Sequence, residues 1–182
     1  MWMDRNRKLI LVVLGIAALV VVAIVQYTQD KADAETTTAS KPKAGYPAPV
    51  IELPNLQDET VTVGGRSDRI QLINFWAAWC GPCELEAPDL QKSYEKYGDQ
   101  IDFLGVNATK FDRERDARNF VEEQKLTFPI LMDREGDATD EYKVKSFPTT
   151  FVVDKSGTIV ERIDGVMTEE DVARIVEQYV NS

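Results

Sequence analysis

The residues best suited to chemistry are the two cysteines of the segment 79–83, WCGPC, which are the only cysteines of the chain. A strand-like run over 71–76 leads into this segment, and a helix-like run over 84–97 leads away from it. A strand that turns directly into a helix places Cys80 at the helix N-terminus, where unpaired backbone N–H groups and the helix dipole favour negative charge. The pKa of a thiol there can fall from about 8.5 to roughly 3.5–7.5. The segment therefore indicates a redox-active thiol pair.

The two thiols have different expected roles. Cys80, exposed at the helix end as a thiolate, would attack a substrate disulfide, and Cys83, one turn later and more buried, would resolve the mixed disulfide. A purely structural disulfide is the weaker interpretation, because it would close too short a loop to constrain the unfolded chain. A zinc site would need further ligands, in a chain without histidine or a third cysteine. We expect no metal and no cofactor besides the Cys80–Cys83 pair.

Composition excludes several other classes of protein. The apolar content of 43% and the charged content of 29% are those of a globular protein. The net charge of −10 argues against nucleic acid as a partner, since phosphate binding requires clustered Lys and Arg. The absence of histidine excludes His-based acid–base catalysis and Ser-His triads.

The N-terminal part of the chain predicts a membrane anchor. Residues 9–26 are uncharged and almost entirely aliphatic, and they follow a tail, residues 1–8, that carries Arg and Lys. As a helix this run is about 25 Å long, close to the roughly 30 Å hydrocarbon core. The positive-inside bias predicts a cytoplasmic tail, a single-pass transmembrane signal-anchor and an extracytoplasmic catalytic domain in the cell membrane. A secretory signal cleaved at 32–34 is the alternative. Both place the cysteines where they can cycle to a disulfide.

The remaining chain divides into a flexible linker at 27–46, which has no apolar period, and a domain at 47–182. Periodicity and turn residues predict alternating strands and helices. Expected strands lie at 50–53, 60–63, 70–76, 101–107, 128–132, 149–153 and 158–163, and expected helices lie at 84–97, 112–125, 137–142 and from 168 onward. The order suggests an α/β fold with a mixed sheet and helices on both faces.

Two separated motifs resemble those of thioredoxins. The segment 74–83 resembles their active-site sequence, and the segment 147–151, FPTTF, resembles their second signature. The anchor, the hairpin at 50–63 and a helix–strand unit between about 110 and 132 resemble instead the membrane-anchored extracytoplasmic thiol-disulfide oxidoreductases of the ResA/TlpA/CcmG type. The resemblance implies a thioredoxin-like mixed sheet flanked by helices, with an N-terminal β-hairpin and a central helix–strand insertion.

The resemblance also implies a substrate-binding surface. It assigns substrate contacts to Trp79, Gly81, Pro82, Phe147 and Pro148. In the family the proline of the second signature is cis and faces the disulfide, so that backbone groups of Phe147 are offered to an extended substrate strand. The sequence alone would favour a trans bond, since only about 5–6% of X–Pro bonds in folded proteins are cis.

Glu86 is the third expected catalytic residue. Thioredoxins carry a buried aspartate where this chain has Asn74, and members of the ResA-like group carry a glutamate three residues after the second cysteine, where this chain has Glu86. A partly buried carboxylate there could have a raised pKa and exchange a proton with Cys83. The alternative is a solvated glutamate of the first helical turn, as we expect for Glu84.

The predicted function is reduction of disulfides in exported proteins, with electrons from a transmembrane thiol donor. Apocytochrome c is a frequent substrate in the resembled group, although Gly81-Pro82 matches thioredoxin rather than the Glu-Pro of the haem-maturation proteins. A disulfide-forming oxidase and a non-catalytic module that binds extended segments are the alternatives. A peroxiredoxin is disfavoured, because that family resembles this chain less: it has Thr or Ser where Ala77 stands.

Overall fold

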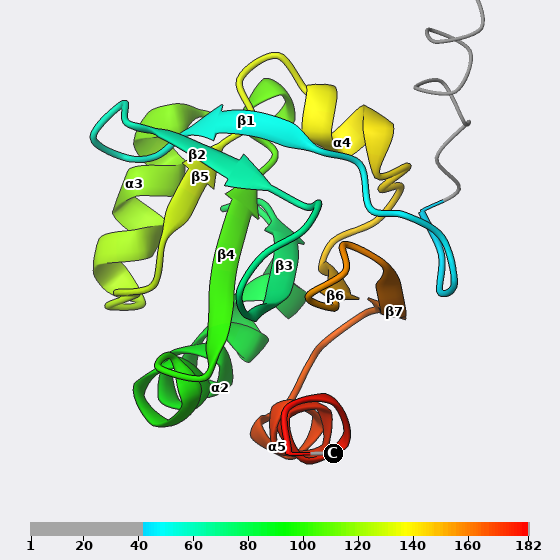
Figure 1. Ribbon diagram of the computed structural model, residues 1–182. Helices are drawn as coiled ribbons and strands as arrows, with labels where there is room; N and C mark the ends of the chain where they lie inside the picture. Colours follow the sequence, from blue (N-terminus) through cyan, green and yellow to red (C-terminus); the bar gives the residue numbers. More distant parts are fainter. Residues whose placement is uncertain (1–41, 182) are drawn as a thin grey trace, which may run out of the picture. The chain divides into compact units, whose positions relative to one another are not determined.

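A five-stranded sheet in the order β5-β4-β3-β6-β7 forms the centre of the computed structural model, which describes residues 42–181 (Figure 1). Its strands are β3 (Ile70–Trp76), β4 (Ile101–Asn107), β5 (Ile130–Met132), β6 (Thr149–Val153) and β7 (Ile159–Asp164). Strands β3, β4 and β5 are parallel to one another, whereas β6 is antiparallel to both β3 and β7. The expected tail at 1–8 and anchor at 9–26 lie outside the described residues. Among residues 42–181, no helix has the length and apolar character that a membrane crossing requires.

The helices and a hairpin cover the two faces of this sheet (Figure 1). Helices α2 (Gly81–Tyr97), α3 (Glu114–Glu123) and α5 (Glu169–Tyr179) share one apolar core with the sheet. The hairpin of β1 (Ile51–Pro54) and β2 (Thr60–Val63) and the short α4 (Asp137–Glu141) share a second core on the other face. The predicted mixed sheet with helices on both faces and an N-terminal hairpin is therefore confirmed.

Strand β3 explains why the cysteines lie where they do. All its residues are buried, as a strand covered on both faces requires. Leu72 and Trp76 pack into the core of α2, α3 and α5, and Ile73 and Phe75 pack into the core of the hairpin and α4. The strand is thus fixed from both sides, and its C-terminal end delivers the chain directly to the N-terminus of α2.

The predicted helix boundaries hold where a local signal sets them. Helix α2 starts at Gly81, three residues before the expected start at residue 84, runs through Pro88 and ends at Tyr97 as expected, with Gly98 as its C-cap. Helix α5 begins with the capping box formed by Thr168 and Asp171, and its side chains Val172, Ile175 and Val176 are buried. The capping box of α5 supplies partners to backbone N–H groups that a helix start leaves unpaired.

The central insertion is shorter in both elements than the sequence predicts. It consists of the 3₁₀ turn η1 (Thr109–Phe111), α3 and β5. Helix α3 starts at Glu114 rather than at residue 112, because Asp112 is extended and its carboxylate bonds other parts of the chain. Strand β5 starts at Ile130 rather than at residue 128, since Pro129 has no N–H to donate to the sheet.

The contacts of the folded part begin before the expected boundary at residue 47. The backbone N–H of Gly45 donates to the Ile159 carbonyl, and the N–H of Ile159 donates to the Tyr46 carbonyl. The Arg162 guanidinium also donates to the carbonyl of Pro42. Residues 42–46, which the sequence places in the linker, therefore lie along β7.

Candidate active site

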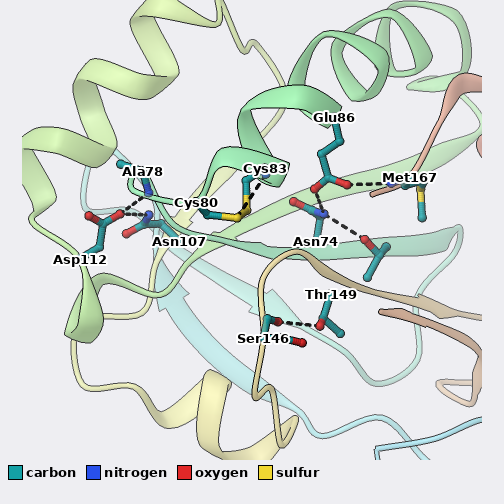
Figure 2. The surroundings of a disulfide bond; sticks show 11 residues. Asn74, Ala78, Cys80, Cys83, Glu86, Asn107, Asp112, Ser146, Thr149 and Met167 are labelled. Atoms are coloured by element: carbon teal, nitrogen blue, oxygen red, sulfur yellow. Dashed lines mark hydrogen bonds between the residues drawn. A yellow bond between two sulfur atoms is a disulfide. The ribbon is translucent and has the colours of Figure 1, made fainter. Parts of the chain in front are cut away.

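Cys80 and Cys83 form a disulfide at the N-terminus of α2 (Figure 2). Their Cα atoms are 5.2 Å apart, within the usual range for disulfides. Cys80 is the N-cap residue, and the backbone N–H of Cys83 donates to its Sγ at 3.2 Å. Pro82 lies in the first turn, where its missing N–H has no helical partner to lose. The predicted position of the cysteine pair at a helix start is confirmed.

The expectation that Cys80 is exposed is wrong for this disulfide form. Its exposed fraction is 5%, and that of Cys83 is 2%. The physical reason is that both cysteines belong to the apolar cluster that also holds Trp76, Ala77 and Ala87, on the buried side of the helix start. Cys80 is still the less buried of the two, whereas Gly81 and Pro82 between them are exposed.

Glu86 is buried one helical turn after Cys83, with an exposed fraction of 1%. Its Oε1 accepts a hydrogen bond from Asn74 Nδ2 at 2.8 Å, and its Oε2 accepts one from the backbone N–H of Met167 at 2.9 Å (Figure 2). Burial raises the pKa of Glu86 to about 7, against the opposing effect of these two bonds. The alternative of a solvated Glu86 is therefore wrong, whereas Glu84 is exposed as expected.

Asn74 connects Glu86 to the sheet. Its Nδ2 donates both to Glu86 and to Thr150 Oγ1, the latter at 2.9 Å. A cavity of about 10 Å³ is lined by Asn74, Cys83 and Glu86 together with apolar side chains. The resolving cysteine and the buried carboxylate thus face a common space, which is about the size of one water molecule.

The Phe147–Pro148 peptide bond is cis, as the resemblance implies. Thr149 Oγ1 donates to the Ser146 carbonyl at 2.8 Å and closes the turn around this bond (Figure 2). The Phe147 ring lies edge-on to the Trp79 ring, with 5.8 Å between centroids. Trp79 is 64% exposed. The structure therefore brings the second signature against the residue that precedes Cys80.

A second group of polar contacts, which the sequence does not reveal, lies on the opposite side of the disulfide from Glu86 (Figure 2). Asp112 Oδ2 accepts from the Ala78 N–H at 2.6 Å and from Asn107 Nδ2 at 2.9 Å. The available signal is topological: Asn107 ends β4 and Trp76 ends the parallel β3. Residues that follow parallel neighbouring strands meet at one edge of the sheet, where sites of α/β proteins form.

Comparison with known proteins identifies a family model and several relatives, all of which agree with a thioredoxin-like protein. Residues 44–162 match the AhpC/TSA family. The chain is 37% identical over 128 residues to the thioredoxin-like protein YneN of Bacillus subtilis, covering 70% of this chain and 75% of that protein. It is 36% identical over 136 residues to the thiol-disulfide oxidoreductase ResA of Geobacillus kaustophilus, covering 73% and 76%.

Solved structures show the same fold. The crystal structure of StoA from Bacillus subtilis matches with a TM-score of 0.63 and 27% identity, covering 70% of this chain and 96% of that one. The thioredoxin domain of a thiol-disulfide oxidoreductase from Bacteroides vulgatus matches with a TM-score of 0.65 and 28% identity, covering 76% and 98%. The thioredoxin-like architecture expected from the two motifs is confirmed.

Proposed function

The chain belongs to the AhpC/TSA family and is a thiol-disulfide oxidoreductase of the ResA type, and on this premise we propose that it reduces disulfides of exported proteins outside the cytoplasm. The observation that carries the proposal is the position of Glu86, buried one turn after Cys83 in the same small cavity. A structural disulfide would gain nothing from a buried carboxylate beside it, because burying such a group costs free energy. A thiol that must lose a proton inside the protein gains a base.

In the first step the Cys80 thiolate attacks one sulfur of the substrate disulfide. A Cys80–substrate disulfide forms, the substrate S–S bond breaks, and the second substrate sulfur leaves as a thiolate that takes a proton from water. The N-terminus of α2 favours the thiolate form of Cys80, since the Cys83 N–H already points at its Sγ at 3.2 Å.

In the second step Cys83 resolves the mixed disulfide. Glu86 accepts the proton of the Cys83 thiol, and the resulting thiolate attacks Cys80 Sγ, which releases the substrate sulfur held in the mixed disulfide as a thiolate that is then protonated. The enzyme is left with the Cys80–Cys83 disulfide, having transferred two electrons to the substrate. A carboxylate with a pKa of about 7 suits this role, because a general base works best when its pKa lies near the working pH. A transmembrane dithiol donor would return the two electrons and the protons.

The substrate segment would lie across Trp79, Gly81, Pro82, Phe147 and Pro148. Trp79, Gly81 and Pro82 are exposed, and the Phe147 ring adjoins Trp79. Phe147 is half-buried and Pro148 is buried, whereas Trp79, Gly81 and Pro82 flank the two cysteines in the sequence, so a chain bound there would present its own cysteine to Cys80. An aromatic surface of this kind binds extended polypeptide through apolar contact with little loss of side-chain entropy.

The proposed location and substrate depend on the sequence and on the relatives. The apolar run at 9–26 after a basic tail supports a single-pass anchor with the domain outside the cytoplasm. The kinship to proteins named ResA supports apocytochrome c as one candidate substrate, as the resemblance implies. The Gly81-Pro82 dipeptide, shared with thioredoxin, supports reduction over oxidation.

The experiment that tests this proposal uses the full chain in its membrane. A Cys83→Ser variant should hold exported proteins, apocytochrome c among them, as mixed disulfides on Cys80. A midpoint potential well below about −180 mV is expected, since values near or above that figure favour oxidation of substrates. A higher potential, or complexes with cytoplasmic proteins alone, would overturn the assignment. Full biological function of Cys80→Ser would point to the non-catalytic binding module instead.

A further inference from the structure

Phe111 and Asp112 accept hydrogen bonds from Trp79 and Ala78, the two residues that immediately precede Cys80. The Asp112 carboxylate accepts from the Ala78 N–H at 2.6 Å, and the indole Nε1 of Trp79 donates to the Phe111 carbonyl at 3.0 Å. Both bonds join the central insertion to the loop between β3 and α2, and Figure 2 shows the one between Asp112 and Ala78. The loop before Cys80 therefore depends on contacts from a segment more than thirty residues away in the sequence.

The Asp112 carboxylate is the centre of this link. Its Oδ2 binds both Ala78 and the side chain of Asn107, and its Oδ1 accepts from the Arg113 N–H at 2.8 Å. One side chain thus joins the loop before Cys80, the end of β4 and the start of α3. Hydrogen bonds from backbone N–H groups to a carboxylate are shorter and stronger than those between neutral groups, so this loop has a defined position.

Trp79 is the residue whose position these bonds determine. Its side chain is 64% exposed, and an exposed side chain normally moves among several rotamers. Here the indole N–H is bonded to the Phe111 carbonyl and the ring lies edge-on against Phe147 at 5.8 Å. These two contacts hold the ring in one orientation, beside the cis Phe147–Pro148 bond.

We propose that Asp112 is a positioning residue that fixes Trp79 as a docking surface for protein disulfides. The proposal rests on the function proposed above, in which Trp79 contacts the substrate. Ordering a side chain before binding removes that entropic cost from the binding step. Loss of the carboxylate should therefore raise KM for a protein substrate about three- to tenfold. The kcat and the midpoint potential should stay unchanged, because the bonds of Asp112 go to Ala78, Asn107 and Arg113 and to neither sulfur.

The test compares Asp112→Ala, Asp112→Asn and Glu123→Ala in the full chain. Reduction of insulin and of the small disulfide 5,5′-dithiobis(2-nitrobenzoate) is measured with dithiothreitol as electron donor. Asp112→Ala should raise KM for insulin and leave KM for the small disulfide unchanged. Asp112→Asn should lie closer to wild type than Asp112→Ala, because its amide oxygen can still accept from Ala78 and Asn107 and only the bond from Arg113 is lost. Glu123, exposed at the end of α3, controls for the lost charge.

Several outcomes would overturn the role of Asp112. An unchanged insulin KM for Asp112→Ala would do so, as would an equal rise for insulin and the small disulfide, or an equal rise in Glu123→Ala. If Asp112→Ala does not fold, Trp79→Phe tests the same link, since it removes the indole donor together with one ring of the indole, and an unchanged insulin KM would then reject the proposal. A wild-type chain without insulin reductase activity would instead reject the proposed function, so the two failures are distinguishable.

Discussion

The backbone N–H of Met167 donates to Oε2 of Glu86 at 2.9 Å, across 81 positions of sequence. Glu86 lies on α2 beside the disulfide, and Met167 lies just before α5. The bond ties the start of α5 to the redox helix, and it also supplies the buried carboxylate with a donor. The ionisation state of Glu86 is therefore linked both to the chemistry of Cys83 and to the stability of the fold.

Glu86→Gln should remove the rise of the resolving rate that is centred near pH 7. In the wild type, Glu86 becomes a competent base as it ionises, so the rate should rise with pH through about 7, the value to which burial raises its pKa. Without that base, resolution at pH 7 should be slower by on the order of 10²-fold. Rapid-quench measurement of the mixed disulfide with a peptide disulfide, from pH 5 to 9, gives this rate.

Glu84→Gln is the matched control, since Glu84 lies in the same helical turn but is exposed. Its rate profile should coincide with that of the wild type. An unchanged titration of the thiols in Glu86→Gln, followed by alkylation, would show that Glu86 exchanges no proton with Cys83.

Glu86→Gln should also change how the free energy of unfolding depends on pH. The pKa of Glu86 is about 7 in the folded protein, against an ordinary value of 4.5 that applies to the unfolded chain. The folded state therefore binds the proton more tightly than the unfolded state does. This contribution to stability is complete below pH 4.5 and is lost as the pH rises through 7. The difference in unfolding free energy between Glu86→Gln and wild type should therefore increase from pH 4.5 to 8, by at most about 3 kcal/mol. Urea unfolding at several pH values measures it, and a constant difference would contradict the raised pKa.

The two cysteines should behave differently when each is replaced by serine. Cys83→Ser retains the attacking sulfur and lacks the resolving one, so a mixed disulfide with a protein substrate should accumulate. Cys80→Ser should form almost none, because Cys83 is the more buried of the two cysteines and lies within the first turn of α2, whereas Cys80 is its N-cap. Non-reducing electrophoresis after incubation with oxidised insulin distinguishes them. Equal amounts of adduct in both variants would reverse or abolish the assigned roles.

Much of the fold could be predicted because local signals determine it. The mostly apolar run Ile70–Trp76 corresponds to β3 residue for residue, since a strand buried on both faces carries mainly apolar side chains, here with Gln71 and Asn74 as the polar ones. Gly98 marks the end of α2, and the Thr168 capping box marks the start of α5. The predicted boundaries at Asp112 and Phe128 are wrong because the observed ones depend on tertiary contacts and on a proline, and the start of α2 at Gly81 rather than at residue 84 depends on the cap that Cys80 provides; periodicity reports none of these.

The candidate site was predictable in part for the same reason. Spacing identifies Cys80 and Cys83, and helical periodicity places Glu86 one turn later. Whether Glu86 is buried depends on Asn74 and Met167, which come from β3 and from the segment before α5. The role of Asp112 depends on an equally distant contact with Ala78. No local pattern encodes such pairs, because they arise only when the sheet brings separate segments together.

Asn74→Asp should convert the buried site into a pair of carboxylates. Asn74 Nδ2 donates to both Glu86 Oε1 and Thr150 Oγ1, and an aspartate would replace this donor with an acceptor that faces the Glu86 oxygen. Two carboxyl groups at hydrogen-bond distance share one proton, and the second ionisation of the pair moves to higher pH. The variant should therefore be close to wild type in stability at pH 5. At pH 8 it should lose roughly 3–5 kcal/mol, the cost of leaving a buried charge without a partner. Urea unfolding at both pH values measures this.

Gln91→Glu gives the matched control for Asn74→Asp within the same protein. Gln91 Nε2 also donates to a carboxylate and to a threonine hydroxyl, those of Glu95 and Thr127. Glu95, however, is exposed, so water can solvate a second negative charge there, and the loss of stability should depend little on pH. A similar, pH-independent loss in both variants would mean that the Asn74–Glu86 pair is hydrated as well. In that case a pKa of about 7 for Glu86 could not stand, and the base for Cys83 would have to be sought elsewhere.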